Sequence, residues 1–148
     1  MRRTLIFLSM LLPLLFVSCN DDDNPENPDE TILRMEGKYA LHDYTADRVN
    51  TVYDIYNPTI GDKRIEIDHI GSGYLEMECE EYGRYGWKEV GEYKFTYANG
   101  LLHTMSRDFN FLVTDDGTLQ VTYLNNNTLM LQSNAGMKTS YRFVRIDD

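Results

Sequence analysis

Residues 90–106 read VGEYKFTYANGLLHTMS, and this stretch indicates the fold class most directly. Aromatic residues stand at every second position from Tyr93 through Phe95 to Tyr97, and charged or polar residues alternate with them. A period of two is typical of a β-strand with one buried and one solvated face. The ANG triplet at 98–100 predicts a tight hairpin, because Asn and Gly adopt the positive φ that such turns need. We expect the ring-bearing face to point into the protein.

The same alternation recurs along most of the chain. It is visible in GKYALHDY from residue 37, TVYDIY from 51, KRIEIDHI from 63, YLEMECEE from 74, FNFLVTDDGTLQVTYL from 109, TLMLQ from 128 and TSYRFVRI from 139. Turn residues separate these segments about every 8–12 residues, and no helical period is visible after residue 18. We therefore expect an all-β domain, a small antiparallel up-and-down barrel of eight or nine strands, since closure removes exposed sheet edges. A two-sheet sandwich fits the pattern less simply.

The start of the chain has the composition of an export signal. Two arginines precede the apolar run LIFLSMLLPLLFV at 5–17, which has the length of a secretory h-region and is too short to span a bilayer. Ser18 and Cys19 then resemble the lipobox of bacterial lipoproteins, although Phe16 stands where Leu is usual. The resemblance implies a signal peptide at 1–18 and acylation of Cys19, for example with palmitate, which anchors a chain in a membrane. The alternative is an ordinary signal peptide followed by an unrelated cysteine.

An acidic segment follows the cysteine. NDDDNPENPDETIL contains six carboxylates, two prolines and few apolar residues. Such a sequence buries too little surface to offset its ordering entropy, so residues 19–33 are expected to form a disordered tether. The triplet Asp21, Asp22 and Asp23 resembles the export signal that sends lipoproteins to the outer face of the outer membrane in one group of Gram-negative gut bacteria. It implies a cell-surface location, and a plain spacer facing the periplasm is the alternative. Residues 34–148 then form a single domain.

Charge and cysteine content narrow the possible partners. The chain has 24 acidic and 14 basic residues and a formal net charge of −10 at pH 7. This argues against a nucleic-acid partner, which requires a basic surface, and is compatible with a cationic protein. Cys79 is the only cysteine besides Cys19 and shares a face with Leu75 and Met77. We expect it to be buried in the core and not to form an intrachain disulfide.

The domain resembles the small lipocalin-like domains of bacterial lipoproteins. Gly37-Lys38-Tyr39 stands where such domains begin with Gly-x-Trp, and the segment 141–145 resembles their closing strand. The resemblance covers residues 37–146 and implies a barrel that holds a small apolar molecule. Arg145 shares parity with the rings of this last strand. It either lies over Tyr39 as a cation–π lid or is a solvated residue at the rim.

No motif for catalysis or metal binding is present. The three histidines lack metal-ligand spacing and the serines lack a nucleophile elbow, so we expect no enzyme activity, metal or cofactor. The predicted function is a lipid-anchored binding module for a small hydrophobic ligand. The candidate ligand-binding residues are Tyr39, Tyr93, Phe95, Tyr97, Tyr141 and Phe143.

Two other functions fit the same features. The chain is alternatively a surface or periplasmic inhibitor of a cationic host enzyme such as lysozyme or a protease, or a structural subunit of a surface complex. The glycine-containing stretch EYGRYGWKEV at 81–90 presents Tyr82, Tyr85 and Trp87 as a candidate contact surface for sugars or proteins. Trp87 alternatively plugs one end of the barrel.

Overall fold

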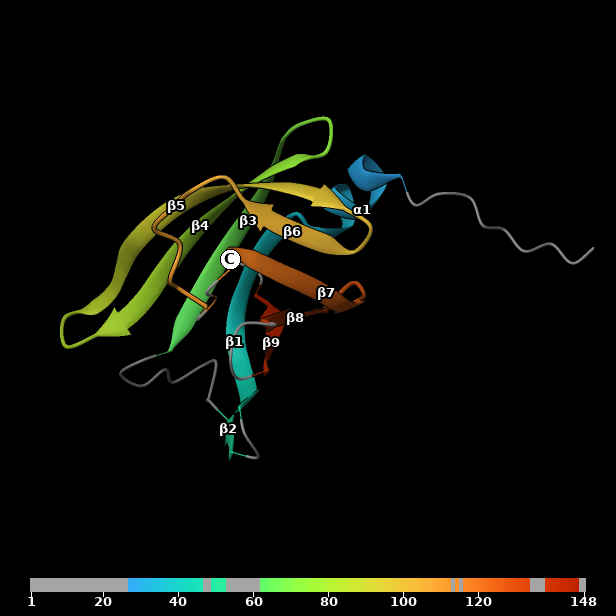
Figure 1. Cartoon of the computed structure of the whole chain (residues 1–148). Helices are drawn as coiled ribbons and strands as arrows, with labels where there is room; N and C mark the ends of the chain where they lie inside the picture. The colour runs from blue at the N-terminus through green and yellow to red at the C-terminus, as the bar shows by residue number, and fades with distance from the viewer. Residues whose placement is uncertain are drawn as a thin grey trace, which may run out of the picture.

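The structure is a computed structural model in which an antiparallel barrel and one short helix make up the described part of the chain (Figure 1). The structure describes residues 27–46, 49–52, 62–112, 114, 116–133 and 138–146. The predicted signal peptide, the predicted acylation site Cys19 and the triplet Asp21, Asp22 and Asp23 lie outside these residues. In the part that is described, no helix has the length and apolar character needed to cross a bilayer.

Eight of the described strands form a closed ring. Each strand pairs antiparallel with the next, and β9 pairs with β1, while β2 folds back on the second half of β1 outside the ring. This closure confirms the predicted barrel and excludes the two-sheet sandwich. The elements are α1 (Pro28–Met35), β1 (Gly37–Ala46), β2 (Val49–Val52), β3 (Lys63–Gly71), β4 (Tyr74–Gly83), β5 (Gly86–Ala98), β6 (Leu101–Thr104), β7 (Thr118–Leu124), β8 (Thr128–Ser133) and β9 (Thr139–Arg145).

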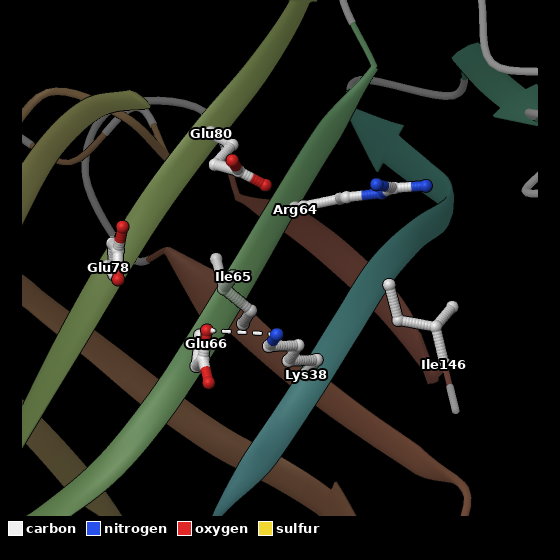
Figure 2. A pocket seen from close by; sticks show the side chains of 7 residues that line it. All are labelled: Lys38, Arg64, Ile65, Glu66, Glu78, Glu80 and Ile146. Carbon is white, nitrogen blue, oxygen red and sulfur yellow. Dashed lines mark ion pairs between the residues drawn. The ribbon is translucent and has the colours of Figure 1, made fainter. Parts of the chain in front are cut away.

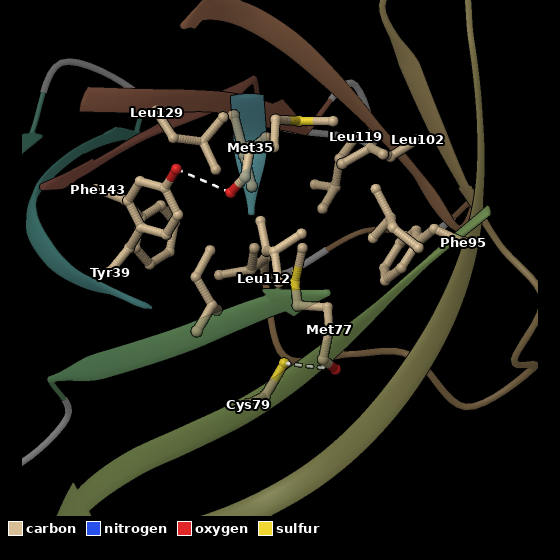
Figure 3. Packing of buried hydrophobic residues seen from close by; sticks show 14 of the residues in the cluster. Met35, Tyr39, Met77, Cys79, Phe95, Leu102, Leu112, Leu119, Leu129 and Phe143 are labelled. Atoms are coloured by element: carbon tan, nitrogen blue, oxygen red, sulfur yellow. Dashed lines mark hydrogen bonds between the residues drawn. The ribbon is translucent and has the colours of Figure 1, made fainter. Parts of the chain in front are cut away.

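The core is the inside of the barrel. The inward positions of the strands alternate with outward polar positions, as the period of two predicts (Figure 3). Phe95 and Cys79 are both 0 % exposed, which confirms the predicted inward faces of β5 and β4. The hairpin between β5 and β6 is also confirmed, since Asn99 and Gly100 have φ values of 51° and 77°.

Helix α1 corrects one prediction. Residues 28–33 were expected to belong to a disordered tether, and no helix was expected in the domain, but they form most of α1. The local signals are those of a helix N-terminus. The side chain of Asn27 accepts a hydrogen bond from the Asp29 amide at 3.1 Å, Pro28 opens the helix, and two acidic residues lie in its first turn.

Packing against the barrel explains why so short and polar a helix forms. Ile32 and Met35 are fully buried at an end of the barrel, and Thr31 is 5 % exposed. Burial of an aliphatic side chain contributes about 1.5–3 kcal/mol. An isolated eight-residue helix is marginal in water, so the barrel supplies the stability that composition does not reveal.

The connection between β6 and β7 corrects a second prediction. The segment FNFLV from residue 109 was expected to be a strand because its apolar residues alternate. Its described residues, 109–112, form no strand in the structure, and Phe109, Phe111 and Leu112 are buried. The alternation reflects side chains inserted into the barrel and not pairing with a neighbouring strand. Of the strand predicted at 51–56, residues 51 and 52 belong to β2 and the rest lie outside the described residues.

Candidate functional site

Tyr39 and Arg145 close the barrel at the end that α1 covers. The Tyr39 hydroxyl donates to the Met35 carbonyl at 2.8 Å (Figure 3). It also accepts from Arg145 Nη2 at 2.7 Å. The Arg145 guanidinium carbon lies 4.9 Å from the centre of the Tyr39 ring. Arg145 is therefore a cation–π lid and not a solvated rim residue. Burial raises the pKa of Tyr39, and the neighbouring Arg145 opposes this rise.

Gly37 makes room for this lid. Its φ is +132°, a conformation that glycine adopts without strain. A Cβ at this position would collide with the Arg145 guanidinium. The Gly-x-Tyr start of β1 and the arginine at the end of β9 are thus parts of a single closure.

A second contact ties α1 to the turn between β3 and β4. The Asp29 carboxylate accepts from the Gly73 amide at 2.6 Å and from the Ser72 hydroxyl at 3.1 Å. His69 Nε2 lies 3.4 Å from the same carboxylate. The Gly73 hydrogen bond lowers the pKa of Asp29, and His69 adds a smaller effect in the same direction. This end of the barrel is consequently shut by both apolar and polar contacts.

Aromatic side chains fill the middle of the barrel. On β5, Phe95 and Tyr97 are buried and Tyr93 is half-buried. The ring of Phe109 packs against the rings of Tyr93 and Phe95. Its centre lies 4.7 Å from that of Tyr93 and 5.1 Å from that of Phe95, with nearly perpendicular planes in both pairs. Such edge-to-face contacts are favourable beyond the area they bury.

Gly91 positions the ring of Tyr93. A Cβ on Gly91 would come within 2.6 Å of the Tyr93 ring and hydroxyl, so the ring lies across this glycine. Gly91 pairs with Cys79 on β4, and the side chain of Cys79 is fully buried. Burial raises the pKa of the Cys79 thiol to about 12. The tyrosine ring therefore covers a small-residue position on the inner wall.

A hollow of about 330 Å³ opens beside Tyr93. It lies far from α1, because Lys63 pairs with Glu81 at the end of the β3–β4 ladder opposite the turn that α1 contacts. Figure 1 shows α1 and the β4–β5 hairpin on opposite sides of the barrel. The lining residues are Lys63, Glu81, Val90, Tyr93, Asn110 and Phe111.

The structure brings together only some of the candidate ligand-binding residues. Tyr93 and Phe95 meet at Phe109, whereas Tyr39 lies at the end that α1 covers. Tyr141 is buried near Tyr44, with ring centres 6.1 Å apart, and burial raises its pKa to about 12. Tyr97 in β5 and Phe143 in β9 are also buried in the core. The ligand-binding role of all six stays a prediction.

Phe109 and Phe111 are the residues of this region that the sequence interpretation missed. Their spacing around the exposed Asn110 is the same in a strand and in an inserted loop. One signal was available in the sequence. No hairpin-turn motif separates these residues from β6, although a strand that paired with β6 would need one.

The outer wall carries a separate hollow of about 290 Å³ (Figure 2). Lys38 and Glu66 form an ion pair at 3.7 Å in it. Glu78 stands directly opposite Glu66 on β3 and Glu92 on β5. Desolvation and then the surrounding carboxylates raise the pKa of Glu78. This face is the solvated side of β3 and β4, as predicted, and it is strongly acidic. Its lining residues are Lys38, Arg64, Ile65, Glu66, Glu78, Glu80 and Ile146.

The predicted aromatic contact surface lies at the β4–β5 hairpin. Tyr85 at its tip is 93 % exposed. Tyr82 and Trp87 pack edge to face with ring centres 5.4 Å apart, and the Arg64 guanidinium lies 3.9 Å from the Trp87 ring. Arg64 lies on the outer face of β3, since its neighbour Ile65 is buried on the inner face. Trp87, which contacts Arg64, therefore lies on the outside of the barrel. It does not plug the barrel end.

Among the residues that the structure describes, no group of three or more His, Cys, Asp or Glu side chains is placed to hold a metal ion.

Comparisons with known proteins show the fold and not a family. No protein-family model matches the chain, and no curated protein is significantly similar to it. Japanin from Rhipicephalus appendiculatus, solved with cholesterol bound, is similar in structure, with a TM-score of 0.52 and 11 % identity over 74 % of each chain.

Two further solved structures are similar at lower scores. A lipocalin-like protein from Bacteroides uniformis has a TM-score of 0.48 and 15 % identity over 76 % of this chain and 99 % of that one. The siderocalin Ex-FABP, described as having dual ligand specificities, has a TM-score of 0.49 and 10 % identity over 77 % of this chain and 71 % of that one. In the described residues, the fold is an antiparallel closed barrel with one short helix, and the likeness to Japanin is a likeness of fold.

Proposed function

We propose that the protein is a non-enzymatic binding module that takes up a small apolar molecule through the barrel end opposite α1. The observation that carries this proposal is the hollow of about 330 Å³ beside Tyr93 and Phe111. Its aromatic wall continues inward through Phe109 to the fully buried Phe95. Ligand sites are typically concave and mostly apolar with few polar groups. The likeness to Japanin, which was solved with cholesterol, supports a ligand of this class.

The test is saturable binding of the neutral apolar dye N-phenyl-1-naphthylamine to the full chain carrying Cys19→Ala, so that no acyl chain competes for the dye. Val90 is exposed and lines the hollow, so Val90→Trp should fill it and reduce the affinity. Leu33→Trp is the matched control, because Leu33 is also exposed but lines a hollow of about 330 Å³ beside α1. Equal loss in both variants, or no saturable binding to the parent chain, contradicts the proposal.

We further propose that acylation of Cys19 anchors this module in the outer membrane and that Asp21, Asp22 and Asp23 direct it to the cell surface. The lipobox-like residues and the acidic triplet support this proposal. Cys19→Ala should abolish palmitate labelling and membrane fractionation. Replacing the three aspartates with Asn should leave the lipoprotein in the membrane but protect it from protease added to whole cells. Unchanged surface digestion would leave the triplet as a spacer.

The predicted inhibitor of a cationic host enzyme remains the second candidate. The acidic row of Glu66, Glu78 and Glu92 across β3, β4 and β5 favours it, because directly opposed like charges are relieved by a cationic partner. Salt-dependent inhibition of lysozyme by the parent chain, weakened in Glu78→Gln, supports this function. Inhibition that does not respond to salt or to Glu78→Gln places the contact elsewhere.

A further inference from the structure

Phe109 occupies an aromatic site that is built by a different part of the chain. Its ring is 5 % exposed and makes edge-to-face contacts with Tyr93 and Phe95, two successive inward residues of β5. Leu112, fully buried near the centre of the core cluster, comes from the same connection as Phe109 (Figure 3). The site therefore has aromatic walls from a strand and an occupant from a connection that is not part of the sheet.

Side-chain burial holds this connection in place. The last contact with the sheet before it is the Met105 amide, which donates to the Lys94 carbonyl at 2.7 Å. The Thr104 amide donates to the Gly117 carbonyl at 2.8 Å where the connection returns. Between these points, the described residues 107–112 form turns and irregular backbone and are not paired with any strand. Withdrawal of Phe109 thus leaves the strand ladders intact.

The hollow at the open end leads to this site. Tyr93 lines the hollow and also contacts Phe109, and Phe111 lines the hollow two residues further along the connection. The two charged residues of the lining, Lys63 and Glu81, form an ion pair with each other. A molecule that enters the hollow therefore meets an aromatic wall whose next member is Phe109.

We propose that Phe109 is a built-in occupant of the ligand site, and that a neutral, planar aromatic molecule about the size of one ring binds between Tyr93 and Phe95 when Phe109 withdraws. The inference rests on the proposed function and specifies its site and ligand class. The geometry favours an aromatic ligand because both wall rings present themselves for edge-to-face contact. A neutral ligand is favoured because the ring contacts around Phe109 are apolar and an unpaired charge is costly to bury.

The test is a series of side chains of different volume at position 109. Toluene is the probe, and its binding is measured by displacement of N-phenyl-1-naphthylamine from the full chain carrying Cys19→Ala. Affinity is reduced by the fraction of molecules in which the site is free, so removal of the occupant should increase it. If Phe109 is withdrawn in less than about a tenth of the molecules, Phe109→Ala should bind at least about tenfold more tightly. Phe109→Leu should be intermediate, and Phe109→Trp should bind more weakly than the parent.

Arg107→Ala is the matched control, because Arg107 is exposed in the same connection, does not line the hollow and should leave the affinity unchanged. Circular dichroism establishes that each variant is folded, and Phe109→Leu replaces Phe109→Ala if the latter unfolds. Binding to the parent with no dependence on residue 109 overturns the inference and leaves the proposed function standing. Binding to Phe109→Ala without binding to the parent would mean that the substitution has created a cavity that the native chain does not open, and it overturns both the inference and the proposed function. Absence of binding in every variant overturns both.

Discussion

The guanidinium of Arg145 lies over the ring of Tyr39 and donates to its hydroxyl, although 106 residues separate the two in the chain. The contact joins the end of β9 to the start of β1, where the barrel closes. The same hydroxyl donates to the Met35 carbonyl, so it also fastens the end of α1. Loss of this single oxygen should therefore loosen strand closure and helix docking together.

Tyr39→Phe tests the hydroxyl. The substitution removes a buried group that makes two hydrogen bonds. The Met35 carbonyl loses this donor, and Arg145 Nη2 keeps only its longer bond to the Arg34 carbonyl at 3.3 Å, so the free energy of unfolding should fall by about 1–3 kcal/mol. Urea unfolding measures the change. Tyr85→Phe is the control, because this ring is 93 % exposed and its change should stay within about 0.5 kcal/mol. Equal stability of the two variants would show that closure does not depend on the hydroxyl.

Gly37→Ala tests the room beneath the lid. An alanine at a φ of +132° is strained, and its Cβ meets the Arg145 guanidinium. Backbone strain should lower the free energy of unfolding by about 1–3 kcal/mol, and the collision with the guanidinium should lower it further. In an Arg145→Ala background the collision is absent, so Gly37→Ala should cost less there in urea unfolding. The same cost in both backgrounds would assign the whole effect to the backbone.

Asp29→Asn tests the polar contact between α1 and the β3–β4 turn. The Gly73 hydrogen bond lowers the pKa of Asp29 below 3.8, so the unfolded chain takes up a proton at higher pH than the folded protein. The carboxylate therefore stabilises the fold above pH 3.8, and this stabilisation is lost as the pH falls through the folded pKa.

The urea midpoint of Asp29→Asn should accordingly lie below that of the parent at neutral pH, and the two should converge in acid. Glu30→Gln is the control, since it removes an exposed carboxylate from the same helical turn. A difference for Asp29→Asn that persists unchanged in acid would mean that the ionised carboxylate is not its source.

Cys79 should be unreactive in the folded protein. Burial raises the pKa of its thiol from 9.0 to about 12, and only the thiolate is nucleophilic. In the Cys19→Ala variant, which has no other thiol, iodoacetamide at pH 8 should label the chain only in urea. The free energy of unfolding should also fall above pH 9.0, because the unfolded thiol ionises there while the folded thiol stays protonated. Rapid labelling without urea would contradict the buried position.

Period-two alternation was sufficient to predict which side chains face inward. Phe95 and Cys79 are buried as expected, because successive side chains of a strand point to opposite faces whatever its neighbours are. The turn at Asn99 and Gly100 was equally predictable, since positive φ is a local property of these residue types. The number of strands favoured a closed barrel over a two-sheet sandwich, and the pairing of β9 with β1 decides between them.

The closed end, the core of the site and the helix depend on contacts between distant segments. The sequence allowed two equally reasonable interpretations of Arg145, a lid over Tyr39 or a solvated rim residue. Closure of the barrel places it over Tyr39. Phe109 lies in an alternating apolar pattern that also suits a strand. Its ring is buried in the barrel because it packs against Tyr93 and Phe95. The segment 28–35 is too short and polar to be helical alone, and burial against the barrel end stabilises it. Local periodicity carries no information about such partners, because their free energy comes from surfaces that meet only after the chain has folded.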